Sequence, residues 1–184
     1  MQKKFEMKDV VVVGAGKIGG AIALLLATSG DYSVVVADRS EEQLAKIDRH
    51  SAISTKVVDV GDGEGLAALL AGRFAVVSAA PFDLTARIAD AALSAGAHYI
   101  DLTEDVATTK TVERLAENAG TAFIPQCGLA PGFISVVASD LAGHFDRLDS
   151  VRMRVGALPQ YPSNALNYNL TWSTDGLINE YIEP

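Results

Sequence analysis

The chain has a single cysteine, Cys127, among its 184 residues, which excludes an internal disulfide. It lacks any apolar run of the ~20 residues that a membrane-spanning helix needs. The polar residues 1–8 lack the apolar core of a signal peptide. One cysteine and three scattered histidines offer no convincing zinc ligands, so no metal is expected. These absences predict a cytoplasmic protein that does not associate with membranes.

Basic residues are scarce relative to acidic ones. The chain has 15 Lys and Arg against 23 Asp and Glu, a formal net charge of −8. Because binding to nucleic acid or to acidic membranes needs a basic surface, neither partner is expected. Hydrophobic residues make up 49% of the chain, enough for the core of an ordinary globular protein. The length predicts one domain or slightly more.

The chain does contain a glycine-rich turn between an apolar strand and a helix. Four valines at 10–13 precede glycines in the pattern G-x-G-x-x-G. In dinucleotide-binding folds the first glycine makes a tight turn, the second lets a pyrophosphate approach, and the third lets helix and strand pack closely. The pyrophosphate then binds the free N–H groups at the start of the helix. The residues predicted to bind it are Gly14, Ala15, Gly16, Lys17, Ile18 and Gly19.

A second apolar strand, residues 32–37, ends at Asp38. In the dinucleotide-binding fingerprint a carboxylate at this distance from the glycines binds the adenosine ribose hydroxyls. The same carboxylate repels a 2′-phosphate, which favours NAD over NADP. Arg39 beside it would instead hold such a phosphate. NAD is therefore the predicted cofactor, with NADP as the alternative.

Strand and helix patterns continue to alternate along the chain. Further strands are predicted at residues 54–58, 74–78, 99–100 and 121–124. Helices are predicted around residues 64–71, 84–95, 112–115 and 131–143. Six strands separated by helices predict an α/β Rossmann fold, a doubly wound parallel sheet with the strand order 3-2-1-4-5-6.

The pattern changes after about residue 145. In residues 150–155, apolar Val151, Met153 and Val155 alternate with arginines, as in a strand of a sheet with one wet face. We therefore expect residues 1–145 to form the nucleotide-binding domain and residues 146–184 to begin a second, α/β substrate or dimerisation domain. So short a tail is too small for a core of its own, so we expect a truncated chain from a longer, homodimeric protein.

Ligands of an open parallel sheet bind beyond the carboxyl ends of its strands. Asp59, with Val60, is placed there to meet the adenine amine, although Asp59 equally fits a turn or a helix cap. Ala79 and Ala80 are small enough to let the ribose-phosphate backbone of a cofactor pass. We therefore add these four residues to the predicted cofactor site.

Hydride transfer also requires a general base. Asp101, Glu104 and Cys127 lie at the same edge of the predicted sheet, and Asp101 and Cys127 are the predicted catalytic residues. A base from sequence downstream is the alternative. Residues 128–132 follow, with Pro131 expected in the first turn of the next helix, where it wastes no donor. That helix start suits a substrate carboxylate, although the segment also fits a plain connection.

Four segments resemble the saccharopine dehydrogenase family, in its saccharopine reductase and lysine 6-dehydrogenase branch. They are residues 11–20, 96–101, 127–133 and 167–181. Many dehydrogenases share the first segment, whereas the last two, in this order, are much more specific. The resemblance covers nearly the whole chain and implies a longer protein in which an α/β substrate domain follows.

The resemblance implies NAD(P)-dependent hydride transfer at a carbon–nitrogen bond of an amino acid. It implies that Gly128, Pro131 and Gly132 shape the nicotinamide side and that Trp172 and Ser173 begin the substrate wall. Asp175 stands where the saccharopine reductase branch carries a basic residue, which favours a lysine-like substrate over saccharopine. The alternative function is a non-catalytic dinucleotide-sensing domain, which would leave residues 150–184 without a catalytic-domain role.

Overall fold

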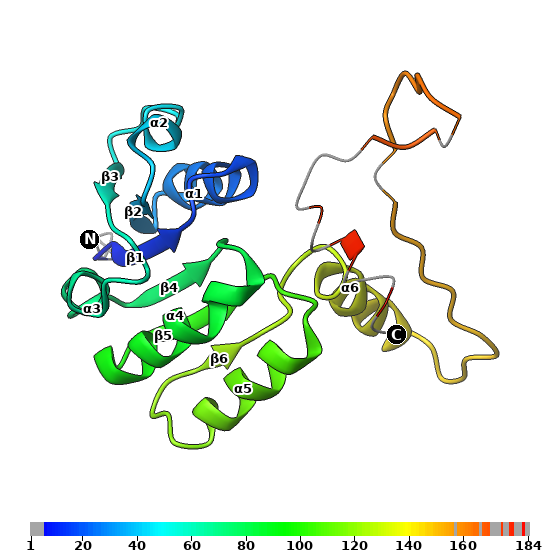
Figure 1. Cartoon of the computed structure of the whole chain (residues 1–184). Coiled ribbons are helices and arrows are strands. Elements are labelled where there is room, and N and C mark those ends of the chain that lie inside the picture. Colours follow the sequence, from blue (N-terminus) through cyan, green and yellow to red (C-terminus); the bar gives the residue numbers. More distant parts are fainter. Residues whose placement is uncertain are drawn as a thin grey trace, which may run out of the picture.

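Strands and helices alternate along the chain in the computed structural model, which describes residues 6–156, 158–165, 167–169, 174, 177–178 and 182 (Figure 1). The strands are Lys8–Val13 (β1), Tyr32–Asp38 (β2), Ile53–Val57 (β3), Ala75–Ser78 (β4), His98–Asp101 (β5) and Phe123–Ile124 (β6). The helices are Lys17–Ser29 (α1), Glu41–Leu44 (α2), Gly63–Leu70 (α3), Phe82–Ala95 (α4), Val106–Ala116 (α5) and Phe133–Ala142 (α6).

The sheet is parallel and has the order β3-β2-β1-β4-β5-β6, which confirms the predicted Rossmann topology. From β1 the chain proceeds to β2 on one side, and β4 later pairs with β1 on the other side. The strand order therefore reverses between β1 and β4. The carboxyl ends of these two strands border the crevice where open α/β sheets bind ligands.

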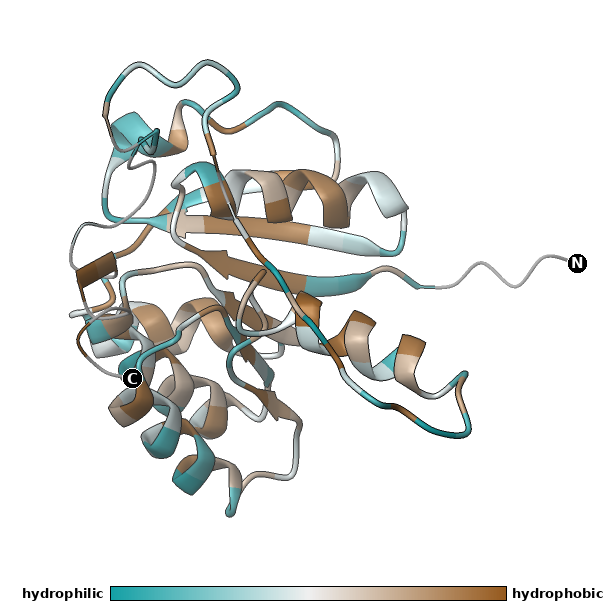
Figure 2. Cartoon of the chain, turned by 90° about the vertical axis from the view of Figure 1, so that its right-hand side faces the viewer, coloured by the Kyte–Doolittle hydropathy of each residue, from teal (hydrophilic) through white to brown (hydrophobic). Residues whose placement is uncertain are grey.

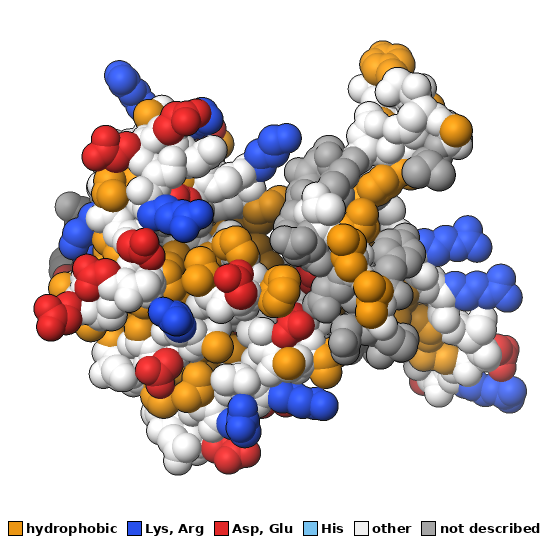
Figure 3. All heavy atoms as spheres, in the orientation of Figure 1, with side chains coloured by type: hydrophobic (Ala, Val, Ile, Leu, Met, Phe, Trp, Pro, Cys, Tyr) orange, Lys and Arg blue, Asp and Glu red, His pale blue; other side chains and the backbone are white. Residues whose placement is uncertain are grey.

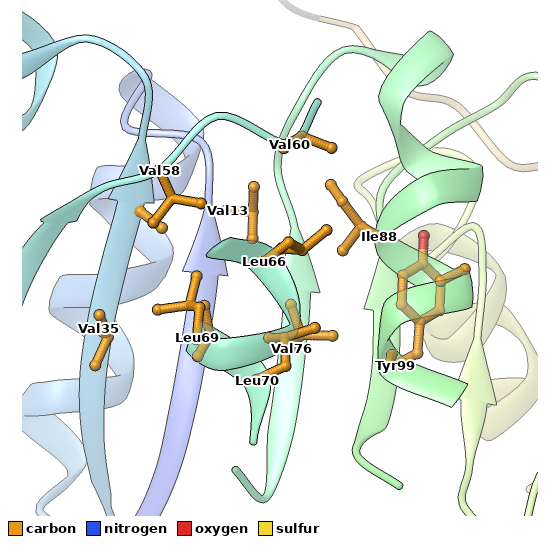
Figure 4. Packing of buried hydrophobic residues seen from close by; sticks show 14 of the residues in the cluster. Val13, Val35, Val58, Val60, Leu66, Leu69, Leu70, Val76, Ile88 and Tyr99 are labelled. Atoms are coloured by element: carbon orange, nitrogen blue, oxygen red, sulfur yellow. The ribbon is translucent and has the colours of Figure 1, made fainter. Parts of the chain in front are cut away.

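Both faces of the sheet are covered, so the buried parts of its central strands, residues 10–13 of β1 and 34–37 of β2, are apolar on both faces. Val11 and Val13 of β1 pack with side chains of α3 and α4, whereas Val10 and Val12 pack on the opposite face with α1. Figure 4 shows the first of these clusters, in which leucines of α3 and Ile88 of α4 cover valines of the sheet. The rows of valines thus supply both layers of the core.

Helix α1 meets the sheet through small side chains. Its buried residues are Gly19, Ala23 and Ala27, at helical spacing, whereas Ile18 and Leu25 are 57% and 71% exposed. The helix ends at Gly30, which has a φ of 81° in the left-handed region that favours glycine. Because the contact face is so small, α1 lies close to β1. This closeness fixes the geometry of the loop between them.

The protein surface carries charges of both signs. Figure 2 shows hydrophobic colouring along the strands and on parts of the helices, and Figure 3 shows acidic and basic side chains interspersed over the face in view. Within the described part of the chain, no helix has both the length and the apolar character needed to cross a membrane.

Two local predictions were wrong. Residues 150–155 form no strand, and Val151, Met153 and Val155 are exposed, because no strand of the described sheet lies alongside to pair with them. Pro131 precedes α6 and is not in its first turn. The helix starts only after Gly132, whose φ of 128° is incompatible with a helical turn.

Candidate functional site

The loop from Gly14 to Gly19 joins β1 to α1 at the carboxyl edge of the sheet. Gly14 has a φ of 109°, and a Cβ there would lie 2.6 Å from the carbonyl oxygen of Ala79. A Cβ at Gly19 would collide with the carbonyl oxygen of Gly14. The Gly14 N–H also donates to the carbonyl oxygen of Ala37 at 2.8 Å. The loop therefore packs so tightly against the ends of β2 and β4 and against the start of α1 that both positions require glycine.

Gly16 differs from Gly14 and Gly19 because the space around its Cβ position is open. No atom lies within 4 Å of the position of a Cβ, and its φ of −70° is ordinary for any residue. It is the N-cap of α1, where no side chain of the described chain caps the helix and no acidic residue occupies the first turn. Lys17 and Ile18 are exposed beside it. This open cradle beside free N–H groups fits the diphosphate of a dinucleotide.

Asp38 connects the glycine loop to the end of β2. One carboxylate oxygen accepts the Ala15 N–H at 2.8 Å, and the other accepts the Ser40 N–H at 2.8 Å. Sequence reasoning expected Asp38 to bind ribose and missed its contact with Ala15. The two hydrogen bonds fix the carboxylate beside the cradle, and Arg39 next to it is exposed. The structure therefore brings together the predicted diphosphate and ribose sites.

The remaining predicted cofactor residues border the same edge. Ala79 and Ala80 are half-buried after β4, and the Ala79 N–H donates to the Val13 carbonyl oxygen at 2.8 Å. Asp59 is exposed, and its Oδ1 accepts the Gly61 N–H at 2.7 Å, as in the turn role left open from the sequence. The Val60 side chain is buried in the apolar cluster of Figure 4, and the adenine contact predicted for Asp59 and Val60 stays a prediction.

Asp101, one of the two predicted catalytic residues, is fully buried at the end of β5. Its Oδ2 accepts the Tyr99 hydroxyl at 2.8 Å. Its Oδ1 accepts the N–H groups of Thr103 at 3.1 Å and Gln126 at 3.0 Å. Both oxygens of Asp101 are therefore engaged inside the protein.

Cys127, the other predicted catalytic residue, lies beside Asp101 but is exposed. Its N–H donates to the Asp101 carbonyl oxygen at 2.7 Å. The preceding residue, Gln126, has a φ of 58°, unusual for a residue other than glycine. No local pattern in the sequence indicates this conformation. The structure thus places both candidates at the same strand ends, with only Cys127 accessible.

The segment after Cys127 folds into a closed turn before α6. The Gly128 N–H donates to the carbonyl oxygen of Pro131 at 2.9 Å, and the Phe133 N–H donates to that of Gly128 at 2.8 Å. The Ala130–Pro131 peptide bond is cis. A Cβ at Gly132 would lie 2.6 Å from the nitrogen of Gly128, so glycine is required there. Trp172, Ser173 and Asp175 lie outside the described residues.

We expect the free energy of unfolding to reveal the charge buried at Asp101. Burial raises the pKa of this carboxyl above its ordinary value of 3.8, although hydrogen bonds from Gln126, Tyr99 and Thr103 act in the opposite sense. The folded chain then binds the proton more tightly than the unfolded chain. Wild type should therefore gain stability relative to Asp101→Asn as the pH falls through the raised pKa toward the ordinary one.

Urea unfolding of both proteins at about pH 7 and about pH 4.5 measures this difference, because the other carboxyl groups cancel between them. A difference in free energy that stays the same at the two pH values would contradict the raised pKa.

Comparisons with known proteins agree with this geometry. The model of the saccharopine dehydrogenase NADP binding domain family matches residues 10–124. Alpha-aminoadipic semialdehyde synthase, mitochondrial, from Rattus norvegicus is 24% identical over 184 residues, 96% of this chain and 20% of the relative. The protein of the same name from Mus musculus is 23% identical with the same coverage. The chain thus spans about a fifth of the length of these curated relatives.

Solved structures share the fold. Apo saccharopine dehydrogenase (L-Glu forming) from Saccharomyces cerevisiae superimposes with a TM-score of 0.74 at 22% identity, covering 93% of this chain and 40% of that one. WbmH from Bordetella bronchiseptica, solved with NAD+, superimposes with a TM-score of 0.51 at 19% identity. The superposition covers 65% of this chain and 55% of WbmH. Because the family match spans more than half of the sequence, the chain belongs to the saccharopine dehydrogenase NADP-binding domain family, and its cofactor is NAD(P).

Proposed function

We propose that this chain is the cofactor-binding part of an oxidoreductase that transfers a hydride at a carbon–nitrogen bond of an amino acid. The observation that supports this most is the open cradle at Gly16 beside the Asp38 carboxylate, at the point where the strand order reverses. Two relatives bear the name of a semialdehyde synthase of alpha-aminoadipic acid, which fits amino-acid chemistry. A lysine-like substrate is proposed because Asp175 would attract its side-chain amine.

The nicotinamide supplies the hydride chemistry, and the protein supplies binding and orientation. Gly14 and Gly19 hold the loop against the strands, Gly16 admits the diphosphate, and Asp38 binds the adenosine ribose. Cys127 faces solvent at the strand ends, where the substrate would meet the cofactor. Of the two residues predicted to take part in catalysis, it is the one placed to reach a substrate.

NAD is proposed over NADP because Asp38 stands where the 2′-phosphate would lie. Asp38→Ala should weaken NADH binding by about 1–3 kcal/mol, since it removes a hydrogen bond to a charged group. NADPH binding should weaken less, because the lost contact with the Ala15 N–H affects both nucleotides, whereas removal of the repulsive charge favours only NADPH while Arg39 remains. Fluorescence titration with both nucleotides measures this. Asp31→Ala, in an exposed residue just before β2, is the matched control, and equal losses for both nucleotides would contradict the assignment.

The same titration on the wild-type chain tests the proposal as a whole. Failure to bind either nucleotide at millimolar concentration would overturn it. If NADH binds but the longer protein reduces no NAD+ with lysine or related amino acids, a dinucleotide-sensing role becomes the better interpretation. The appearance of reduced-nicotinamide absorbance distinguishes the two functions.

Residues 146–184 are proposed to begin a substrate and dimerisation domain of a homodimeric protein. The exposure of Val151, Met153 and Val155 supports this, since the described chain offers them no apolar layer. A cytoplasmic location stays a prediction, and the curated relatives are named as mitochondrial. The absence of a nucleic-acid partner also stays a prediction from the net charge.

A further inference from the structure

We infer that Asp101 is a positioning residue that fixes residues 126–133 at the carboxyl edge of the sheet, beside the reacting end of the cofactor. The inference rests on the proposed function for the identity of that ligand. Its structural part rests on hydrogen bonds that join Asp101 to the segment leading to α5 and to the segment leading to α6.

Asp101 joins two separate segments to β5. Its carboxylate accepts the Thr103 N–H of the segment leading to α5 and the Gln126 N–H of the segment leading to α6. Its backbone carbonyl accepts the Cys127 N–H at 2.7 Å. The Tyr99 hydroxyl, itself fully buried, orients the second carboxylate oxygen at 2.8 Å. The carboxylate is therefore oriented by the buried Tyr99 hydroxyl, and it in turn binds the backbone of both segments.

The segment that Asp101 holds has few other attachments in the described chain. β6 consists of only Phe123 and Ile124, so the sheet ladder ends two residues before Gln126. On the other side, α6 has no buried residue. The bonds among Gly128, Pro131 and Phe133 close the turn on itself but do not attach it to the sheet. The left-handed Gln126 and the Cys127 that follows are thus anchored mainly through Asp101.

The same geometry argues against a general-base role for Asp101. A general base must come within hydrogen-bond reach of the proton that it removes. The side chain has no exposed surface, and both of its oxygens already accept hydrogen bonds. Its effect on substrate therefore passes through the position of Cys127 and the turn that follows.

Cys127 is the single cysteine of the chain and is exposed, so its alkylation rate reports the position of this segment. We expect Asp101→Ala to raise the iodoacetamide labelling rate of the full chain at least about fivefold, because the loop opens more often. Asp101→Asn keeps an acceptor oxygen for Gln126 and should stay within about twofold of wild type. Asp90→Ala, in an exposed residue of α4, is the control for loss of a carboxylate. Circular dichroism checks that each variant is folded.

NADH should slow labelling of wild type and protect Asp101→Ala less. A rate for folded Asp101→Ala within about twofold of wild type overturns the inference. If that variant does not fold, hydrogen exchange of wild type decides. Slow exchange of the Gln126 and Cys127 amides, comparable to Tyr99, supports anchoring, and exchange as fast as in residues 146–150 overturns it. If wild type binds no NADH, the proposed function is refuted. The difference in labelling rate between wild type and Asp101→Ala without NADH still tests the inference.

Discussion

Gly16→Ala is expected to weaken NADH binding at least about 100-fold while changing the free energy of unfolding by less than about 0.5 kcal/mol. The position tolerates a methyl group because its φ is −70° and no atom lies within 4 Å of the new Cβ. That open space is where the diphosphate must approach the backbone. A methyl group there would displace the phosphates from the first N–H groups of α1, and hydrogen bonds to charged groups are worth about 1.5–3 kcal/mol each.

Calorimetric titration with NADH and urea unfolding measure the two quantities separately. Gly120→Ala is the matched control, because Gly120 is also exposed and also has no atom within 4 Å of its Cβ position, but precedes β6 at the opposite edge of the sheet. Its NADH affinity should equal that of wild type. Unchanged affinity in Gly16→Ala would mean that the diphosphate does not bind at this loop.

The fold was predictable because local and long-range signals agree. The valine runs of β1 and β2 are apolar on both faces, which is typical of buried parallel strands. The helix predicted at residues 84–95 ends at Gly96, which has the left-handed conformation that favours glycine. Once strands and helices alternate, right-handed crossovers leave few alternative strand orders.

The errors arise where the outcome depends on partners that the local sequence does not specify. Residues 150–155 have the alternation of a strand, but a strand also needs a neighbour with which to pair. Pro131 resembles the first residue of a helix, yet Gly132 after it has a φ of 128° that delays the helix start. In both cases the structure depends on contacts and backbone conformations that the local sequence pattern does not specify.

The sequence predicted which edge of the sheet carries the candidate residues better than it predicted their contacts. The rule that ligands bind at carboxyl strand ends located Asp38 and Asp101, because it depends only on topology. It could not show that Asp38 accepts the Ala15 N–H or that Asp101 is fully buried. Those features depend on the distances between segments brought together by folding. The order of residues along the chain does not specify those distances.

Gly19→Ala should lower the free energy of unfolding by about 3 kcal/mol, the upper end of the usual range for overpacking. The new Cβ would collide with the Gly14 carbonyl oxygen, a backbone atom that cannot rotate away. α1 would have to move off β1, which would also disturb the loop that binds the cofactor. We therefore expect NADH binding to be lost together with stability, in contrast to Gly16→Ala.

The next residue provides the control. A Cβ at Gly20 would lie 3.4 Å from the Ile47 Cδ1 atom, the end of a flexible side chain, so Gly20→Ala should stabilise α1 by about 0.5–1 kcal/mol. At roughly 2–4 °C per kcal/mol for a chain of this size, the two variants should shift the Tm in opposite directions. Thermal unfolding followed by circular dichroism measures both. If Gly19→Ala melted at or above the wild-type temperature, the close contact between α1 and the glycine loop would be wrong, and with it the reason that Gly19 is glycine.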